Sequence, residues 1–246
     1  MKKALITGAN KGIGFEVARQ LLQKGYFIYI GSRDLENGYK AADQLKLEGF
    51  TTIEVIQLDV TDQESVNKAR KQIENNSTVL DVLINNAGIS GNVPQTALET
   101  QPNTYTSVFD TNLYGVIRVT QAFIELLKKS DEPRIVNVST SVGSLTMQSD
   151  KNWMAYESAK YPVYAASKAA MNMYTVMLAY ELRDSSFKVN AVCPGYTKTD
   201  FTYHLGTGTV EEAAQRIVKY AIIGNDGPSG KFFSEETNPG SGEIAW

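Results

Sequence analysis

Short runs of β-branched and aliphatic residues alternate with segments of helical periodicity along this chain. In the first helical segment, for example, Phe15, Ala18, Leu21 and Leu22 recur at three- and four-residue steps. Strands and helices that alternate in steps of about 25 residues are typical of right-handed crossovers between parallel strands. The pattern predicts an α/β fold, with a doubly wound parallel sheet of about seven strands and helices on both faces. The expected strands are residues 4–7, 27–30, 53–58, 79–84, 135–138, 189–192 and, at the sheet edge, 231–233.

Length, composition and charge limit what such a chain can be. Its 246 residues, of which 42 % are hydrophobic, suffice for one sizeable core. No repeat or linker divides them before a Gly/Pro-rich tail at residues 224–242, so we expect a single domain over residues 1–246. With 24 basic and 27 acidic residues the formal net charge is −3, which excludes a strongly basic nucleic-acid-binding protein.

The sequence carries no signal for membranes, disulfides or metals. No apolar run approaches the ~18 residues of a membrane-spanning helix, and the apolar run after the first lysines is too short for a signal peptide. We therefore expect a cytoplasmic protein that does not bind membranes. Cys193 is the single cysteine and His204 the single histidine, so neither an internal disulfide nor a zinc site is expected.

A glycine-rich turn lies between the first expected strand and the first expected helix. Glycines let the backbone approach a pyrophosphate closely, and the free N–H groups at the start of the following helix attract its charge. Because strand, turn and helix occur in this order, the segment predicts a dinucleotide-binding site rather than a structural turn. Its expected cofactor-binding residues are Gly8, Asn10, Lys11, Gly12, Ile13 and Gly14.

Three further motifs follow in the order Asn85-Asn86-Ala87-Gly88, Tyr164-Ala165-Ala166-Ser167-Lys168 and Pro194-Gly195. Together with the glycine-rich turn they resemble the short-chain dehydrogenase/reductase family over nearly the whole chain. The resemblance implies a Rossmann domain and an oxidoreductase that binds a nicotinamide cofactor. It also implies contacts to the adenosine side of the cofactor from Asp59, Val60, Asn86, Ala87 and Gly88, and to its nicotinamide side from Tyr164, Lys168, Pro194, Gly195, Thr197 and Thr199.

The end of the second expected strand distinguishes NAD from NADP. NAD needs a carboxylate there for the ribose 2′-hydroxyl, whereas the 2′-phosphate of NADP needs cations. The sequence reads Ser32-Arg33-Asp34 at this place, and Lys11 adds a second cation. Since a guanidinium matches phosphate in charge and geometry, Ser32 and Arg33 favour NADP(H). Two alternatives stay open: Arg33 pairs on the surface with Asp34 or Glu36, or Asp34 turns inward and serves NAD.

Tyr164 is the expected proton donor for a carbonyl oxygen that receives negative charge during hydride transfer. Lys168 lies four residues later on the same helix face, and its ammonium is expected to lower the pKa of the phenol. Tyr156 and Lys160 form a rival pair at the same spacing. Pro162 favours a helix that begins near it and carries Tyr164, because proline is tolerated in a first turn but breaks a helix interior.

The family resemblance implies two more catalytic groups. One is a hydroxyl after the fifth strand that holds the substrate carbonyl. Gapless matching puts Thr140 there, where serine is usual; Ser141 is the alternative, and Ser139 is expected to be structural. Threonine supplies the same donor and acceptor as serine. The other group is Asn112, which lies in an expected long helix and is expected to hold a water linked to Lys168; the alternative is an ordinary buried asparagine of the core.

An insertion at residues 145–161 separates Thr140 from Tyr164 by more residues than is common in the family. With Ser32-Arg33 and the C-terminal segment, it most resembles the NADPH-dependent carbonyl reductase subgroup. The short segment 198–210 predicts a shallow, accessible pocket. Substrate contacts are expected from Thr140, Met147, Trp153 and Tyr196; the alternative is that such apolar side chains only cap the core.

These features predict an NADPH-dependent reductase of small aldehydes, ketones or quinones, acting as a monomer or homodimer. An NAD(H)-dependent alcohol dehydrogenase of the same family is one alternative. A non-catalytic NADP(H)-binding regulatory protein is the other. Such proteins typically lack the tyrosine or the lysine, and both are present here.

Overall fold

Seven parallel strands form one sheet in the order β3-β2-β1-β4-β5-β6-β7. The computed structural model describes all 246 residues. The predicted parallel sheet is confirmed, including its short edge strand. The strands are β1 (Lys3–Thr7), β2 (Phe27–Ser32), β3 (Ile53–Gln57), β4 (Val82–Asn85), β5 (Arg134–Val138), β6 (Lys188–Val192) and β7 (Phe232–Phe233).

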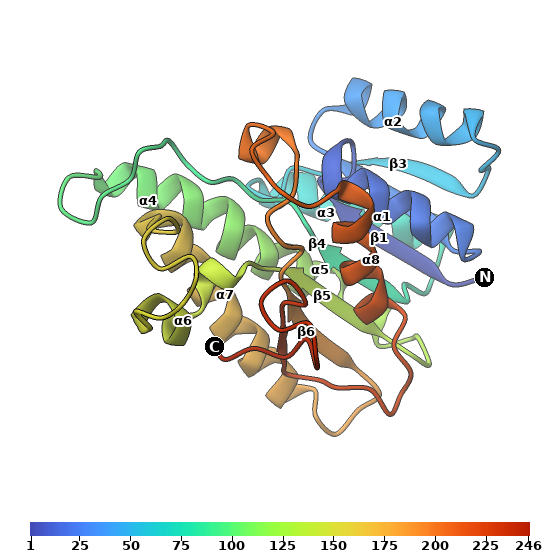
Figure 1. Cartoon of the computed structure of the whole chain (residues 1–246). Coiled ribbons are helices and arrows are strands. Elements are labelled where there is room, and N and C mark those ends of the chain that lie inside the picture. Colours follow the sequence, from blue (N-terminus) through green and yellow to red (C-terminus); the bar gives the residue numbers. More distant parts are fainter.

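Helices connect the strands and cover both faces of the sheet (Figure 1). One face carries α1 (Gly12–Gln23), α2 (Leu35–Leu47) and α8 (Val210–Ala221). The opposite face carries α3 (Gln63–Asn76), α5 (Gly115–Leu127) and α7 (Pro162–Glu181), and α4 (Pro102–Phe109) packs beside α7. The short helix α6 (Leu145–Ser149) lies in the predicted insertion. None of the helices combines the length and apolar character that a membrane crossing requires.

Alternate side chains of each strand enter two separate cores. Ile6 and Ile28 pack in the cluster that includes α1 and α8, whereas Leu5 and Tyr29 pack in the cluster that includes α3 and α5. Because both faces of the sheet are covered, apolar residues are found on both faces of the strands rather than on alternate positions only.

Two elements differ from the prediction. Strand β4 begins at Val82, three residues later than expected, because the main chain of Leu80 bonds to α5 instead of to a neighbouring strand. The N–H of Leu80 donates to the C=O of Leu126 at the end of α5 (3.1 Å), and the Asp81 carboxylate accepts from the N–H of Lys3 (2.7 Å). The helix expected around Asn112 is interrupted by a π-helical turn, η1 (Asp110–Tyr114), between α4 and α5.

Candidate active site

The sheet order reverses direction between β1 and β4, and ligands of open α/β sheets bind outside the carboxyl ends of the strands at such a point. The glycine-rich turn follows β1 and the Asn86 segment follows β4 at this edge. The segment before α8, drawn in orange in Figure 1, crosses the same edge toward α1. There Lys11 forms an ion pair with Asp200 (2.8 Å), and the Phe201 ring lies 5.6 Å from the Tyr164 ring.

The glycine-rich turn is held in a fixed shape. Gly8 and Gly12 have positive φ angles of 63° and 57°, which glycine adopts without strain. The Asn86 side-chain amide donates to the C=O groups of Thr7 (2.9 Å) and Gly8 (3.1 Å), and a Cβ on Gly14 would lie only 2.5 Å from its nitrogen. No side chain caps the start of α1, which leaves its first N–H groups for an anion. The turn therefore fits a pyrophosphate.

Arg33 is left without an ion pair by the surrounding contacts. The Ser32 hydroxyl is buried and donates to the C=O of Asp34 (2.6 Å), while the Asp34 carboxylate accepts an N–H of the first turn of α2 (2.9 Å). Glu36 pairs with Lys40 (2.7 Å). Neither carboxylate considered as a surface partner of Arg33 forms that pair, and Asp34 is engaged as a helix cap.

The other expected adenosine contacts lie on loops at the same edge. The Asp59 carboxylate accepts both the N–H and the hydroxyl of Thr61 (2.9 and 2.7 Å), and Val60 is buried beside Gly115. The N–H of Ala87 donates to the hydroxyl of the buried Thr7 on β1 (2.9 Å), as does the N–H of Asn86. These bonds fix the position of the Asn86 segment relative to the glycine-rich turn.

Tyr164 and Lys168 both lie on α7, which begins at Pro162 as the sequence predicts. Lys168 is only 4 % exposed; its ammonium donates to the C=O of Val138 at the end of β5 (2.7 Å) and lies 5.9 Å from the centre of the Tyr164 ring. Gly88 brings the Asn86 segment to the same place, because a Cβ on it would lie 3.6 Å from the lysine nitrogen.

The rival pair Tyr156 and Lys160 lies before the helix, in turns of the insertion. The Lys160 ammonium is 3.8 Å from the centre of the Tyr156 ring and donates to the side chain and the C=O of Gln148 (2.9 and 3.0 Å). These contacts tie the insertion together.

Burial is the main cause of the pKa shifts of Tyr164 and Lys168, which both lie on α7. It raises the pKa of the Tyr164 phenol above its ordinary value and lowers the pKa of the Lys168 ammonium to about 8. The expected lowering of the phenol pKa is therefore wrong for the protein alone. The main cause is desolvation, because a buried environment disfavours the charged phenolate.

The three candidate hydroxyls after β5 have different surroundings. The Thr140 oxygen accepts the N–H of Val142 (3.3 Å) at the edge of the site, which leaves its hydrogen free to donate. Ser141 is 8 % exposed and lies 4.0 Å from the sulfur of Cys193. Ser139 donates to the buried amide of Asn172 (2.6 Å), as expected for a structural residue. The turn after Thr140, η2 (Ser141–Gly143), packs directly on α7 at Lys168.

Asn112 is fully buried in the π-helical turn. Its side chain accepts the N–H of Ile89 (2.9 Å) and donates to the C=O of Ile89 (2.8 Å) and to the Ser167 hydroxyl (3.0 Å). Ser167 in turn donates to the C=O of Tyr164 (2.7 Å). Both side-chain amide hydrogens of Asn112 are already donated, so only its side-chain and main-chain oxygens are left to accept a hydrogen bond from a water. The role of Ser167 was not predicted, although it lies inside the Tyr164–Lys168 motif.

Two charged residues that the sequence did not single out hold the Pro194-Gly195 segment. Arg216 of α8 donates to the C=O of Pro194 (2.6 Å), and Glu236 accepts the N–H of Tyr196 (3.0 and 3.2 Å). Gly195 has a φ of 91°, and a Cβ on it would meet both side chains. Only the fold brings these distant residues to the segment, so no local sequence signal marks them.

The two threonines expected to contact the nicotinamide side of the cofactor come directly after this segment in the chain. Thr197 is 2 % exposed and donates to the C=O of Gly195 (3.1 Å). Thr199 is more accessible, and its methyl group lies 3.8 Å from the position of a Cβ on Gly12. Thr199 therefore borders the glycine-rich turn from the opposite side of the crevice.

The residues expected to contact the substrate differ in how exposed their side chains are. Met147 packs against a small cluster that includes Cys193 and Phe232. Trp153 is partly buried in the insertion, while Tyr196 is 47 % exposed. Phe201, which the sequence analysis did not single out, is 42 % exposed and in contact with the Tyr164 ring.

Comparison with known proteins agrees with this geometry. A family model described as short chain dehydrogenase matches residues 2–209. The chain is 36 % identical to (−)-isopiperitenone reductase of Mentha piperita, over 95 % of this chain and 96 % of that protein. It is 34 % identical to (+)-neomenthol dehydrogenase of Capsicum annuum, over 94 % of each.

Solved structures of reductases have the same fold. NADPH-bound carbonyl reductase from chicken fatty liver matches with a TM-score of 0.86 and 27 % identity, over 100 % of this chain and 99 % of that one. Salutaridine reductase from Papaver somniferum matches with a TM-score of 0.82 and 30 % identity, over 95 % and 100 % of the two chains. The fold, the ordered motifs and these matches lead to one conclusion: the chain belongs to the short-chain dehydrogenase family and is an oxidoreductase.

Proposed function

We propose that the protein is an NADPH-dependent carbonyl reductase that converts small aldehydes, ketones or quinones to alcohols. The observation that carries the proposal is the buried Lys168 ammonium, 5.9 Å from the Tyr164 ring, beside Gly88 and at the carboxyl end of β5. Burying a lysine ammonium costs folding free energy, so a buried lysine beside a candidate site indicates a function for its charge. Reductases among the similar proteins, one of them solved with NADPH, support the same activity.

The proposed mechanism assigns one task to each residue. Bound NADPH supplies the hydride. Tyr164 donates its phenolic proton to the carbonyl oxygen, and the Lys168 ammonium stabilises the phenolate that remains. The free hydrogen of the Thr140 hydroxyl donates to the same oxygen and orients the substrate. Asn112 holds Ser167, which fixes the main chain of Tyr164.

We propose that the charges at the adenosine end of the cofactor site favour NADP over NAD. Arg33 has no competing carboxylate and is available for the 2′-phosphate, whereas the hydrogen of the neighbouring Ser32 hydroxyl is already donated to the C=O of Asp34. Lys11 is paired with Asp200 at the surface, and an exposed pair of this kind is weak enough for a phosphate to replace it. Asp34 would have to leave its capping position to serve NAD.

Replacing the guanidinium tests this assignment. We expect Arg33→Ala to weaken NADPH binding about 10- to 100-fold, the usual effect of losing a charge-assisted hydrogen bond, and to leave NADH binding nearly unchanged. Titration of both cofactors by nicotinamide fluorescence measures this, with Arg183→Ala, at an exposed position just after the end of α7, as the matched arginine control. Equal losses for NADPH and NADH would remove the phosphate role.

Variants of Thr140 and Ser141 test which of the two hydroxyls donates to the substrate oxygen. We expect Thr140→Val, which keeps the shape of the side chain, to lower kcat/KM about 100-fold, as the loss of one donor to a developing oxyanion does. Ser141→Ala is expected to have a much smaller effect, because Ser141 is buried beside Cys193. Steady-state kinetics with one aldehyde compares the two, and the reverse order would assign the role to Ser141.

We propose an accessible substrate pocket formed in part by Tyr196, Phe201 and Trp153, with Met147 supporting the insertion at residues 145–161 from inside. Alignment with the neomenthol dehydrogenase extends over 302 positions, more than the 246 residues of this chain, so that relative carries segments that this protein lacks. The short segment 198–210 is in line with a less enclosed site.

The direct test is turnover of a panel of aldehydes, ketones and quinones with NADPH and with NADH, followed by the absorbance of the reduced nicotinamide. We expect reduction with NADPH and a much lower kcat/KM with NADH. Tight NADPH binding without any turnover would instead indicate a regulatory protein. Preference for NAD and alcohols would indicate a dehydrogenase.

A further inference from the structure

The N-terminus of α7 lacks a cap from its own sequence. The side chain of Tyr161, which precedes the helix, bonds no backbone N–H, and Pro162 in the first turn has no N–H to donate. The N–H groups of Val163 and Tyr164 therefore need acceptors from elsewhere in the chain. Because Tyr164 is the proposed proton donor, any group that binds these N–H groups also fixes the start of its helix.

Gln95 supplies the missing acceptor from the loop between β4 and α4. Its side-chain oxygen accepts the N–H groups of Val163 (3.1 Å) and Tyr164 (3.3 Å), and its side-chain nitrogen donates to the C=O of Ser90 (2.7 Å). Gln95 is only 7 % exposed, so water competes little for these bonds. The residue caps α7 in the way that a serine or aspartate caps a helix locally.

These bonds belong to a hydrogen-bond network that holds both the N–H and the C=O of Tyr164. The segment that Gln95 binds begins with Ile89, whose N–H and C=O are both bound by Asn112 (2.9 and 2.8 Å). Asn112 also donates to Ser167 (3.0 Å), and Ser167 donates to the C=O of Tyr164 (2.7 Å). Gln95 thus holds the N–H of Tyr164 while Ser167 holds its C=O.

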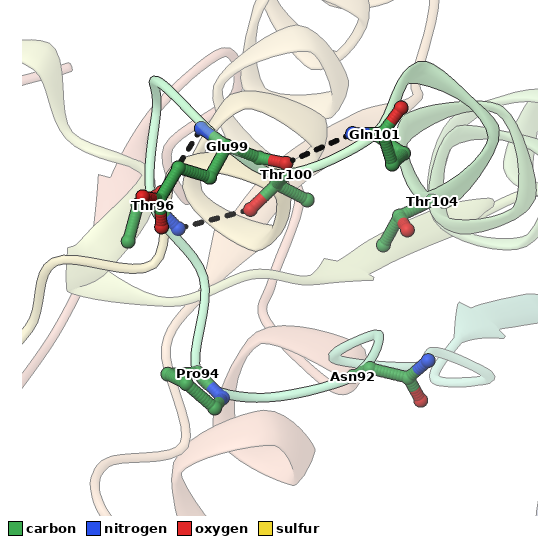
Figure 2. Close-up of a pocket in the computed structure, with 7 residues that line it drawn as sticks. All are labelled: Asn92, Pro94, Thr96, Glu99, Thr100, Gln101 and Thr104. Atoms are coloured by element: carbon green, nitrogen blue, oxygen red, sulfur yellow. Dashed lines mark hydrogen bonds between the residues drawn. The ribbon is translucent and has the colours of Figure 1, made fainter.

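The loop that carries Gln95 also contains hydrogen bonds of its own. Directly after it, the N–H of Thr96 donates to the Thr100 hydroxyl (2.9 Å) and the N–H of Glu99 donates to the Thr96 hydroxyl (3.1 Å), as Figure 2 shows. On the other side Gly91 has a φ of 78°, and a Cβ there would lie 3.2 Å from the Gln95 amide nitrogen. The Gln95 side chain therefore has a defined place from which to hold α7.

We propose that Gln95 is a positioning residue for carbonyl reduction. By binding the first turn of α7 it fixes the Tyr164 phenol relative to the Gly88–Ile89 segment, which borders Lys168 and the proposed cofactor site. Its amide is a neutral acceptor, so it caps the helix without placing a negative charge near the phenol, where such a charge would disfavour the phenolate. This inference rests on the proposed function.

Two substitutions at this position separate positioning from simple stability. Gln95→Leu keeps the volume and removes the bonds: we expect kcat to fall 10- to 100-fold, the NADPH dissociation constant to stay within twofold, and hydrogen exchange at the Val163 and Tyr164 amides to accelerate at least tenfold. Gln95→Glu keeps the acceptor for α7 but loses the donor to the C=O of Ser90, so we expect it to restore only part of kcat. In alcohol oxidation, its added charge should move the pH profile to higher pH, because it raises the pKa of the phenol.

Ser77→Ala is the matched control, because buried Ser77, at the C-terminal end of α3, accepts the N–H of Val79 (3.2 Å) at the amino ends of the strands, the opposite edge of the sheet from the site. It should lower the melting temperature as a lost buried hydrogen bond does and leave kcat unchanged. If Gln95→Leu keeps the wild-type kcat, or loses kcat only in proportion to NADPH binding, the positioning role is wrong. If the wild-type protein reduces no carbonyl compound, the proposed function fails first, and the inference falls with it.

Discussion

Tyr164→Phe is expected to reduce carbonyl turnover by about 100- to 10,000-fold, the range for loss of a general acid. The substitution removes only the hydroxyl, so the ring contact with Phe201 and the packing of α7 are kept. NADPH binding should therefore change little, and the loss should appear in kcat. Single-turnover kinetics at saturating NADPH measures it directly.

Tyr156→Phe is the matched control for this experiment. Tyr156 has the same spacing to a lysine, but its ring packs under Lys160 in the insertion and outside α7. We expect the variant to retain most of its turnover. An active Tyr164→Phe together with an inactive Tyr156→Phe would overturn the choice of proton donor.

Lys168→Met is expected to abolish most turnover without loss of stability. Burial lowers the pKa of Lys168 in the folded protein from 10.5 to about 8, so the folded state binds this proton more weakly than the unfolded chain does. The buried charge thus destabilises the folded protein by roughly 3 kcal/mol at neutral pH. Removing the ammonium relieves this cost, but it also removes the hydrogen bond to Val138, which reduces the stabilisation by about 1 kcal/mol. Thermal unfolding should show an equal or higher melting temperature, whereas kcat falls about 100-fold or more.

The same lowered pKa predicts the pH dependence of both quantities. The destabilisation by Lys168 is complete below about pH 8 and disappears as the pH rises from about 8 toward 10.5, since the unfolded chain then also loses the proton. Reduction should decline above about pH 8, because the neutral amine no longer stabilises the phenolate. A kcat/KM profile that stays flat to about pH 9.5 would contradict the role of the ammonium.

The fold was predictable because its signals are local. Each parallel strand is buried on both faces, so an apolar run such as residues 27–30 marks the strand by itself. The error at β4 arose where an apolar side chain serves another purpose: Leu80 is buried against the end of α5, outside the ladder. The π-helical turn at Asn112 likewise has no local signature, because it depends on bonds to Ile89 and Ser167.

The candidate site was predictable where a motif carries the residue, and not where the fold alone brings residues together. Tyr164 and Lys168 are four residues apart, so one helix places both. Arg216, Glu236 and Gln95 come from distant segments, and only the assembled structure shows what they hold. The wrong direction for the phenol pKa has the same origin, because burial is a property of the whole fold.

The origin of the hydrogen added to the carbonyl carbon shows whether this site transfers hydride with Tyr164 as the proton donor. The protein and its Tyr164→Phe variant are incubated with an aldehyde and NADPH deuterated at the transferring position, and the alcohol is analysed by mass spectrometry. The account predicts an alcohol that carries deuterium at the former carbonyl carbon with the wild-type protein, and hardly any alcohol with the variant. An alcohol without deuterium, or equal amounts from both proteins, would contradict it.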